Sequence, residues 1–262
     1  MATAVVGLSA SRMSVGRVFD RAFATVRTNP LVTIGLTILF GGLPAVAVEY
    51  LIAQVPPEAF YMTVGSLALP GSVPLALTKW FLGLVIGTIC LGAMTRPVVA
   101  YSYGRKAGFG ESLMLGFRFM PQLLFLGIIF GLSVVVGTTF LIVPGFIVYV
   151  LWMIAAPALA DEGDGVFLSL SRSQELSEGA RWKCLAVLLL ACVIVMILAA
   201  IGAIGVLAVG RLNTFSAAST AWLAVLVTST QLVWATVQAS LYVELRDWKE
   251  GPGIDNLEDV FA

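Results

Sequence analysis

The chain has 262 residues, of which 59% are hydrophobic and only 11% are charged, with fifteen basic residues, fifteen acidic residues and no histidine. Soluble domains are roughly 45–50% apolar and about 25% charged, so this composition excludes an ordinary soluble protein and predicts an integral membrane protein. The lack of histidine also excludes catalytic triads and zinc-protease sites that depend on this residue.

Residues 1–30 are predicted to form an N-terminal cytoplasmic amphipathic helix, with no cleavable signal peptide. Apolar side chains share one face and charged side chains the other: Val15, Val18, Phe19, Ala22, Phe23 and Val26 against Arg17, Asp20, Arg21 and Arg27. Such a helix is typical of the headgroup region of a membrane. The apolar face is equally compatible with packing on the protein's own cytoplasmic loops, so both interpretations stay open.

Residues 31–243 are predicted to form an all-α, polytopic helical bundle in the membrane. A helix that crosses the hydrocarbon core needs about 20 apolar residues, whereas a β-barrel would show alternating segments of about ten. Six stretches fit the helical pattern, at residues 31–53, 75–103, 122–141, 144–160, 183–209 and 221–243. The third and fourth are separated at Pro144-Gly145, because this pair is a turn signal and proline begins helices well.

The basic residues predict the orientation, because short cytoplasmic loops retain lysine and arginine. With the N-terminus inside, thirteen of the fifteen basic residues lie on the cytoplasmic side, and only Lys79 and Arg211 lie outside. The bias favours an even number of spans. Both termini, including the tail at residues 244–262, are therefore expected in the cytoplasm.

Short polar segments before the third and fifth spans resemble the N-terminal helix. They read "GFGESLMLGFRFMP" and "GVFLSLSRSQELSEGARWK", and each begins at a glycine. The pattern predicts a unit of one surface helix and two spans, repeated three times. We therefore expect three cytoplasmic interfacial helices.

The second of these segments is predicted to be helical from Asp164 to Gly179, where a glycine can end a helix in the left-handed conformation. Val166, Phe167 and Leu170 share an arc of this helix, together with several serines. Such a surface suits a helix that lies across the ends of other helices.

Four residues near this segment are candidates for a site: Arg172, Arg181, Trp182 and Lys183. In one interpretation Arg172 pairs with Asp161, Glu162 or Glu244 and clamps the surface helix to the bundle. In the other, the basic residues hold an anionic lipid headgroup or phosphate, with Trp182 at the membrane interface. The clamp is the favoured interpretation.

Four polar residues within or beside spans are candidates for an intramembrane polar path: Glu49, Arg96, Gln231 and Gln238. Ionisable groups inside a membrane are expensive and are therefore functional suspects. Gly41-Gly42 and Pro44 are expected to kink the first span and to open room beside it. The simpler interpretation of the Gln231/Gln238 line is hydrogen bonding between helices.

Other chemistry has little support in the sequence. The three carboxylates of "DEGD" (residues 161–164) lack the ligand spacing of a calcium loop, so helix capping is favoured over a metal site. Cys90, Cys184 and Cys192 lie in or beside spans and are interpreted as packing residues. We expect no catalytic residue, no cofactor, no metal and no nucleic-acid partner.

Four local patterns together resemble the bacterial family called the glycerophosphoryl diester phosphodiesterase membrane domain. They are Pro144-Gly145-Phe146, Ala156-Pro157-Ala158, "LSRSQELSEGARW" (170–182) and "LYVELRDWKEG" (241–251), although Gln174 and Ser177 depart from the family's usual aromatic and threonine. The resemblance implies a multi-pass protein of the bacterial inner membrane. It implies no activity, because the catalytic domain for which the family is named is absent from this sequence.

The expected function is that of a non-enzymatic inner-membrane module that organises lipids, or a partner protein, through its cytoplasmic interfacial helices. The alternative is a transporter or channel for a small or lipid-like solute. A transporter predicts a cavity near the middle of the bundle that the polar-path residues reach. A module predicts a dry bundle with grooves at the interface.

Overall fold

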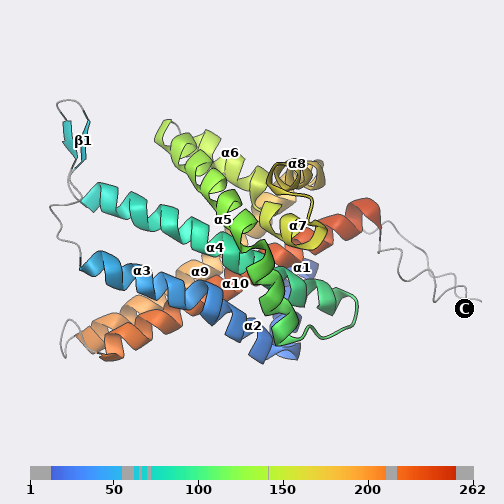
Figure 1. Ribbon diagram of the computed structural model, residues 1–262, viewed down its shortest axis with the longest axis horizontal. Coiled ribbons are helices and arrows are strands. Elements are labelled where there is room, and N and C mark those ends of the chain that lie inside the picture. Colours follow the sequence, from blue (N-terminus) through green and yellow to red (C-terminus); the bar gives the residue numbers. More distant parts are fainter. Residues whose placement is uncertain are drawn as a thin grey trace, which may run out of the picture.

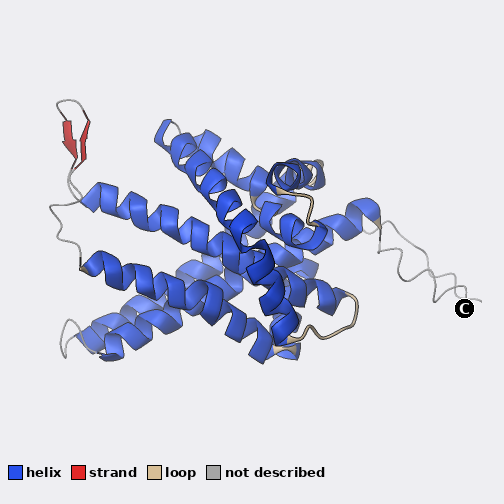
Figure 2. Ribbon diagram, in the orientation of Figure 1, coloured by secondary structure: helices blue, strands red, loops and turns tan. Residues whose placement is uncertain are grey.

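The computed structural model describes residues 13–54, 62–64, 67–69, 72–140, 142–210 and 217–251. These residues are almost entirely helical (Figure 2). The helices are α1 (Val15–Thr28), α2 (Pro30–Thr37), the π-helical turn η1 (Ile38–Gly42), α3 (Leu43–Ala53), α4 (Ser72–Ser102), α5 (Phe109–Phe140), α6 (Ile142–Trp152), α7 (Ala155–Glu162), α8 (Val166–Ser177), α9 (Arg181–Gly210) and α10 (Ala217–Glu250). The all-α prediction omitted one antiparallel hairpin, in which β1 (Met62–Val64) pairs with β2 (Leu67–Leu69).

Six helical stretches in the described part of the chain are long and apolar enough to cross a membrane. They are Pro30–Val48, Leu77–Ser102, Phe109–Thr138, Gly145–Glu162, Arg181–Gly205 and Ala224–Glu250. Long helices suit a bilayer, because a bilayer offers the backbone no hydrogen-bonding partners outside the helix itself. The predicted number of apolar helices is therefore confirmed for the residues that the structure describes.

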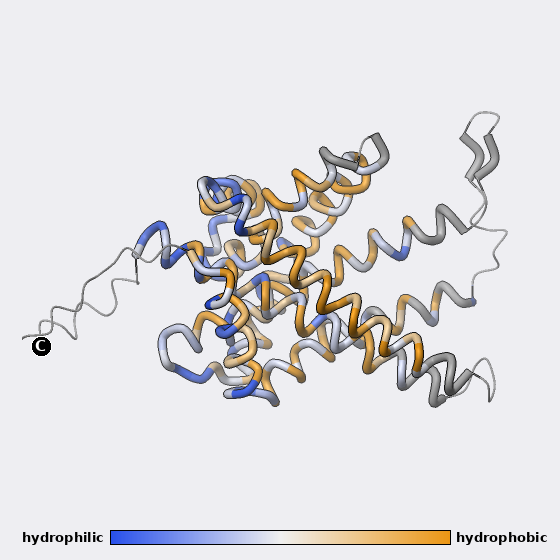
Figure 3. The backbone as a smooth tube through the Cα atoms, turned by 180° about the vertical axis from the view of Figure 1, so that it is seen from behind, coloured by the Kyte–Doolittle hydropathy of each residue, from blue (hydrophilic) through white to orange (hydrophobic). Residues whose placement is uncertain are grey.

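Consecutive spans run in opposite directions, so that polar segments far apart in the sequence meet at one end of the bundle (Figure 1). This charged end consists of α1, the connection from α4 to α5, α8 and the last turns of α10. Hydrophilic residues gather there, whereas hydrophobic residues cover the long helices (Figure 3). Lys79 lies near the start of α4, away from the charged end, and Arg211 lies outside the described residues.

The first span is interrupted at the predicted place, since η1 contains Gly41 and Gly42 and ends just before Pro44. A π-helical turn and neighbouring glycines are known causes of helix kinks. The expectation that these glycines open room beside the helix is wrong. A Cβ on Gly41 would lie 3.2 Å from Cys90 Sγ, and one on Gly42 would overlap the Thr228 side chain. The two glycines instead let α4 and α10 approach closely.

The predicted surface helix before the third span does not exist as a separate element. Phe109–Phe140 is one continuous helix, α5, with Pro121 inside it. An internal proline removes one backbone hydrogen bond and costs about 3 kcal/mol. Packing on both sides of Pro121 offsets this cost, because Ser112 and Leu123 are both fully buried. Among the described residues the repeat is therefore incomplete, with α1 and α8 as its separate surface helices.

The apolar face of α1 packs on the protein itself. Val18 and Ala22 are 0% and 3% exposed, although Phe23 on the edge of the face is 55% exposed. In α8 most of the expected surface packs on the bundle, since Leu170, Ser169 and Ser173 are buried, but Phe167 is exposed. The small serines allow a closer approach to the bundle than Phe167 would, and Ser173 also donates a hydrogen bond to the Leu151 carbonyl at 2.7 Å.

The fourth span begins slightly before the predicted boundary and is broken in its second half. A new helix, α6, starts at Ile142, directly beyond the end of α5 at Phe140. Gly145 permits this tight hairpin, because a Cβ there would lie only 2.6 Å from the backbone nitrogen of Thr138. A turn at Met153-Ile154 then separates α6 from α7. This break was not predicted, although Pro157, four residues after Met153, has no N–H to bind the Met153 carbonyl.

The sixth span is longer than predicted, because α10 continues without interruption to Glu250. Residues 244–250, expected to belong to a separate tail, form its last turns. Their charged side chains make ion pairs with neighbouring helices, which stabilise the helical conformation beyond the apolar stretch. Residues 252–262 lie outside the described part of the chain.

Replacing Gly145 with alanine should destabilise the protein by about 1–3 kcal/mol, the usual cost of overpacking, because the added Cβ would displace the α5 backbone. Thermal unfolding in detergent measures the effect. Gly110→Ala is the matched control, since a Cβ at Gly110 meets no atom within 4 Å. Equal melting temperatures for both variants would contradict the close α5–α6 hairpin.

Candidate functional site

The last turns of α10 join the other polar elements of the charged end through a buried carboxylate. Glu244 is 3% exposed and accepts hydrogen bonds from Arg17 Nε at 2.8 Å and from the backbone nitrogen of Ser14 at 3.1 Å. Arg21 Nη2 lies 3.7 Å from its other oxygen. The hydrogen bond to Glu244 raises the pKa of Arg17 despite partial burial. Glu244 therefore fixes α1 to α10.

A second group of charges joins α7 to α10. Tyr242 donates a hydrogen bond to Asp161 at 2.9 Å and lies 3.0 Å from Glu162 Oε1. Arg246 forms an ion pair with Asp161 and donates to the Tyr103 hydroxyl at 2.9 Å. The first carboxylates of "DEGD" thus bind protein side chains, and their arrangement serves helix packing.

Arg172 connects α8 to the same group. Its Nε lies 3.0 Å from both oxygens of Glu162, and its Nη2 pairs with Glu250. Burial lowers the pKa of Arg172, but the hydrogen bonds to Glu250 and Glu162 outweigh burial and raise it. The predicted ion pair is confirmed for Glu162. Asp161 and Glu244, the other carboxylates considered, bind different arginines.

The remaining candidates from this segment are not brought together. Lys183 Nζ donates to the Met13 carbonyl at 2.8 Å, while Trp182 is 83% exposed. Arg181 is also exposed and makes no ion pair with another described residue. Gly179 has a φ of +81°, directly after the C-cap of α8, so its predicted role in ending the helix is confirmed.

Arg96 belongs to a polar pocket of about 510 Å³ at the charged end, which we call the charged-end pocket. Arg96 Nε donates to Glu111 at 2.9 Å. Helices α4 and α5 supply Arg96, Arg118 and Gln122 to the pocket, and α7 supplies Asp161 and Glu162. The pocket therefore has a basic wall and an acidic wall.

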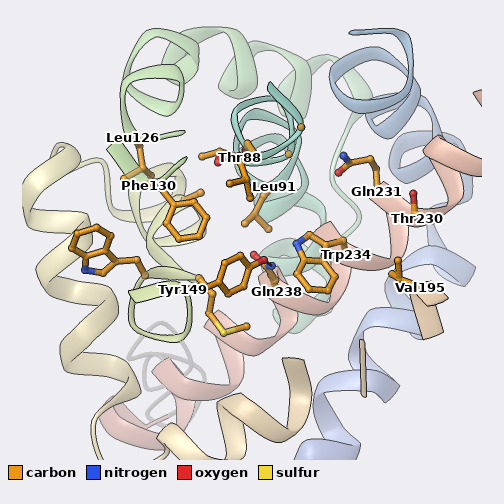
Figure 4. A pocket seen from close by; sticks show the side chains of 16 residues that line it. Thr88, Leu91, Leu126, Phe130, Tyr149, Val195, Thr230, Gln231, Trp234 and Gln238 are labelled. Atoms are coloured by element: carbon orange, nitrogen blue, oxygen red, sulfur yellow. Dashed lines mark hydrogen bonds between the residues drawn. The ribbon is translucent and has the colours of Figure 1, made fainter. Parts of the chain in front are cut away.

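The two glutamines of the predicted polar path reach a different space, a cavity of about 210 Å³ among α4, α5, α6, α9 and α10 (Figure 4). We call it the central cavity. Aromatic side chains form much of its wall, from Phe130, Tyr149, Trp152 and Trp234. Arg96 does not line it, and the Glu49 side chain lies outside the described residues. The predicted path is thus divided between two spaces.

Gln238 explains how the break between α6 and α7 is tolerated. In the amide orientation that satisfies both of its ends, Gln238 donates to the Met153 carbonyl at 2.8 Å and accepts from Trp234 Nε1 at 2.6 Å. A carbonyl freed by the break therefore keeps a partner inside the bundle. Hydrogen bonding between helices, the simpler interpretation of this residue, is confirmed for Gln238.

An apolar groove of about 540 Å³ adjoins the central cavity. The two spaces share Leu84, Tyr149, Val195 and Trp234. Trp234 follows Gln231 by three residues, so the helical spacing already places it on the same line as the two glutamines. No periodicity marks Tyr149, because α6 is apolar on all sides and only the folded structure shows which side faces the cavity.

Comparisons with known proteins found no match: no family model, no curated protein and no solved structure is similar to this chain. The resemblance to the phosphodiesterase membrane domain therefore stays a prediction. Segments that carry it do lie together at the charged end, because Arg172 from "LSRSQELSEGARW" and Tyr242 from "LYVELRDWKEG" both bind Glu162.

Replacing Arg172 with alanine should lower the free energy of unfolding by about 2–3 kcal/mol. This is less than the roughly 3–5 kcal/mol for a fully buried pair, because the Arg172 and Glu162 side chains are each 22% exposed. Arg181→Ala removes an exposed arginine from the same end and should change stability little. Equal losses in the two variants, measured by thermal unfolding in detergent, would contradict the clamp.

Replacing Glu244 with glutamine should loosen α1, because Arg17 and Arg21 would lose their shared carboxylate. Limited trypsin digestion measures the effect, with faster cleavage expected at arginines of α1. Glu175→Gln is the control, since the Glu175 side chain is 65% exposed. Unchanged cleavage of the Glu244 variant would show that other contacts hold α1.

Proposed function

We propose that the protein is a non-enzymatic inner-membrane module that binds a zwitterionic phospholipid headgroup in the charged-end pocket, with this end in the cytoplasm. The observation that carries the proposal is the pairing of a basic wall with an acidic wall in one polar pocket. A phosphate next to an amine, as in phosphatidylethanolamine, has the matching charges. Asp161 and Glu162 also bind Arg246 and Arg172, but an anionic headgroup would still lie beside their oxygens and offer them no amine.

Arg118 is the group best suited to bind the phosphate. Its guanidinium lies 5.7 Å from the Phe119 ring and makes no ion pair with another described residue. Arginine can offer two parallel hydrogen bonds to phosphate oxygens. Arg96, by contrast, already binds Glu111. Binding of the phosphate should therefore depend more on Arg118 than on Arg96.

Exposed aromatic residues of α5 and α8 also lie near the pocket. Arg118, Gln122 and Phe125 are spaced i, i+4 and i+7 on α5, so they share one face of that helix. Phe125 is 48% exposed and lies 6.4 Å from the Phe167 ring, which is itself 68% exposed. The acyl chains of a lipid held at Arg118 would lie along this apolar surface, which α8 helps to form.

A transporter is the second candidate, and the central cavity with Gln231 and Gln238 is the observation that favours it. Flux of a solute across vesicles that contain the purified protein distinguishes the two functions, since a lipid-organising module gives none. In the other form of the proposed function, the module binds a partner protein at the exposed face of α8. It would bind independently of Arg118.

Replacing Arg118 with glutamine should weaken phosphatidylethanolamine binding about tenfold or more, because a hydrogen bond to a charged group contributes about 1.5–3 kcal/mol. Native mass spectrometry with phosphatidylethanolamine and phosphatidylglycerol of identical chains measures both affinities. Arg181→Gln is the matched control and should bind like the unmodified protein.

Equal binding by the Arg118 and Arg181 variants would contradict the proposed headgroup site. So would a preference of the unmodified protein for phosphatidylglycerol, because the acidic wall would then make no contribution to binding.

A further inference from the structure

The central cavity has a continuous aromatic wall built from three helices. The Phe130 and Tyr149 rings lie 5.2 Å apart, and the Tyr149 and Trp234 rings lie 6.3 Å apart. Figure 4 shows Tyr149 between the other two rings, with Gln238 beside it. Because Gln238 is hydrogen-bonded to its neighbours, this wall is held in place by the protein itself.

Two residues of the cavity lining carry polar groups that lack a partner in the described part of the chain. Trp152 Nε1 donates to no described residue but has almost no accessible surface, so only the half-buried Gln231 is within reach of a ligand in the cavity. The Gln231 amide also makes no hydrogen bond within the described part of the chain, whereas Thr88 and Thr230 bind carbonyls of their own helices. A polar group in an apolar cavity is unfavourable without a partner, so the Gln231 amide points to a ligand with hydrogen-bonding atoms.

The lining also limits the charge of such a ligand. No Lys, Arg, Asp or Glu side chain is among the described residues that line the central cavity. A phosphate or carboxylate placed there would lose its hydration without gaining a counter-ion, which is strongly unfavourable. The ligand's polar part should therefore be uncharged. This condition separates the central cavity from the charged-end pocket.

The adjoining groove indicates what the rest of the ligand is. Its lining is almost wholly apolar and includes Trp80, Phe146 and Met196, which are 40%, 41% and 70% exposed. The groove thus opens to the outside of the helical bundle. In a membrane this position suits a hydrocarbon tail that enters from the bilayer and ends at the cavity.

We infer that the central cavity and the groove together bind an amphiphile with one hydrocarbon tail and an uncharged, hydrogen-bonding head, such as a monoacylglycerol. The head accepts or donates hydrogen bonds at Gln231 beside the aromatic wall, and the tail lies in the groove. This site does not depend on the proposed headgroup site, because the two spaces share no lining residue.

Gly83 allows the cavity to be filled without disturbing the fold. It lines the cavity, and a Cβ built on it meets no atom within 4 Å. Gly83→Leu should therefore occupy space that the ligand needs. Gly110→Leu makes the same change at another glycine of a long helix with open space around it, and Gly110 does not line the cavity.

Quenching of tryptophan fluorescence by a monoacylglycerol brominated on its chain measures binding in detergent, because Trp80 and Trp234 line the groove. We expect saturable quenching of the unmodified protein and of Gly110→Leu. The affinity should fall at least tenfold in Gly83→Leu and in Gln231→Leu. Lysophosphatidylcholine with the same brominated chain should bind at least tenfold more weakly than the monoacylglycerol.

Quenching that does not saturate, equal quenching by the two amphiphiles, or full affinity in Gly83→Leu would overturn the inference. If Gly83→Leu does not fold, as judged by thermal unfolding, Gly83→Ala and Gln231→Leu carry the test. Arg118→Gln should leave monoacylglycerol binding unchanged, so that failure at one site is distinguishable from failure at the other.

Discussion

Carboxylates at the ends of otherwise apolar helices must find positive partners, and this requirement organises the whole charged end. Glu244 and Glu162 are removed from most of the surrounding solvent, which costs several kcal/mol per ion unless a partner compensates. Their partners come from α1, α8 and α10, and those from α1 and α10 are distant in sequence from the carboxylates that they bind. The same contacts place Asp161 and Glu162 on one wall of the charged-end pocket. The pocket's charge pattern therefore follows from the way the helices are fastened together.

In the middle of the bundle, backbone carbonyls need hydrogen-bonding partners, just as the carboxylates at the charged end need positive ones. An interrupted helix inside a membrane is tolerated only where the protein supplies partners for the freed carbonyls. Here Ser173 binds the Leu151 carbonyl and Gln238 binds that of Met153. Because Gln238 also binds Trp234, the break and the aromatic wall of the central cavity depend on one side chain. The Gln231 amide has no partner in the described part of the chain and lines the central cavity.

The sequence predicted the helical class and the number of apolar helices from hydropathy, and the interruption of the first span from its glycines and proline. It also predicted the end of α8 at Gly179 and the Arg172–Glu162 pair among three alternatives. It could not predict the continuity of α5 through Pro121, since packing of the flanking turns offsets the proline's cost. It also could not predict the break after Trp152, because the carbonyls freed there are satisfied by residues distant in sequence. Arg96 and the two glutamines of the predicted polar path do not line the same space. Sequence periodicity shows which face of its own helix a residue occupies, but not which residue of another helix it meets.

The position of the acidic wall depends on the Arg172–Glu162 contact, which couples α7 to α8. A double-mutant cycle measures the energy of this coupling directly. Unfolding free energies of the Arg172→Ala and Glu162→Ala proteins, the double variant and the unmodified protein give the interaction energy of the pair. We expect a coupling of about 1–3 kcal/mol, within the range measured for residues in one ion-pair network. Strictly additive effects would contradict this coupling, because other contacts would then position α7 and α8. The acidic wall would not depend on the Arg172–Glu162 pair.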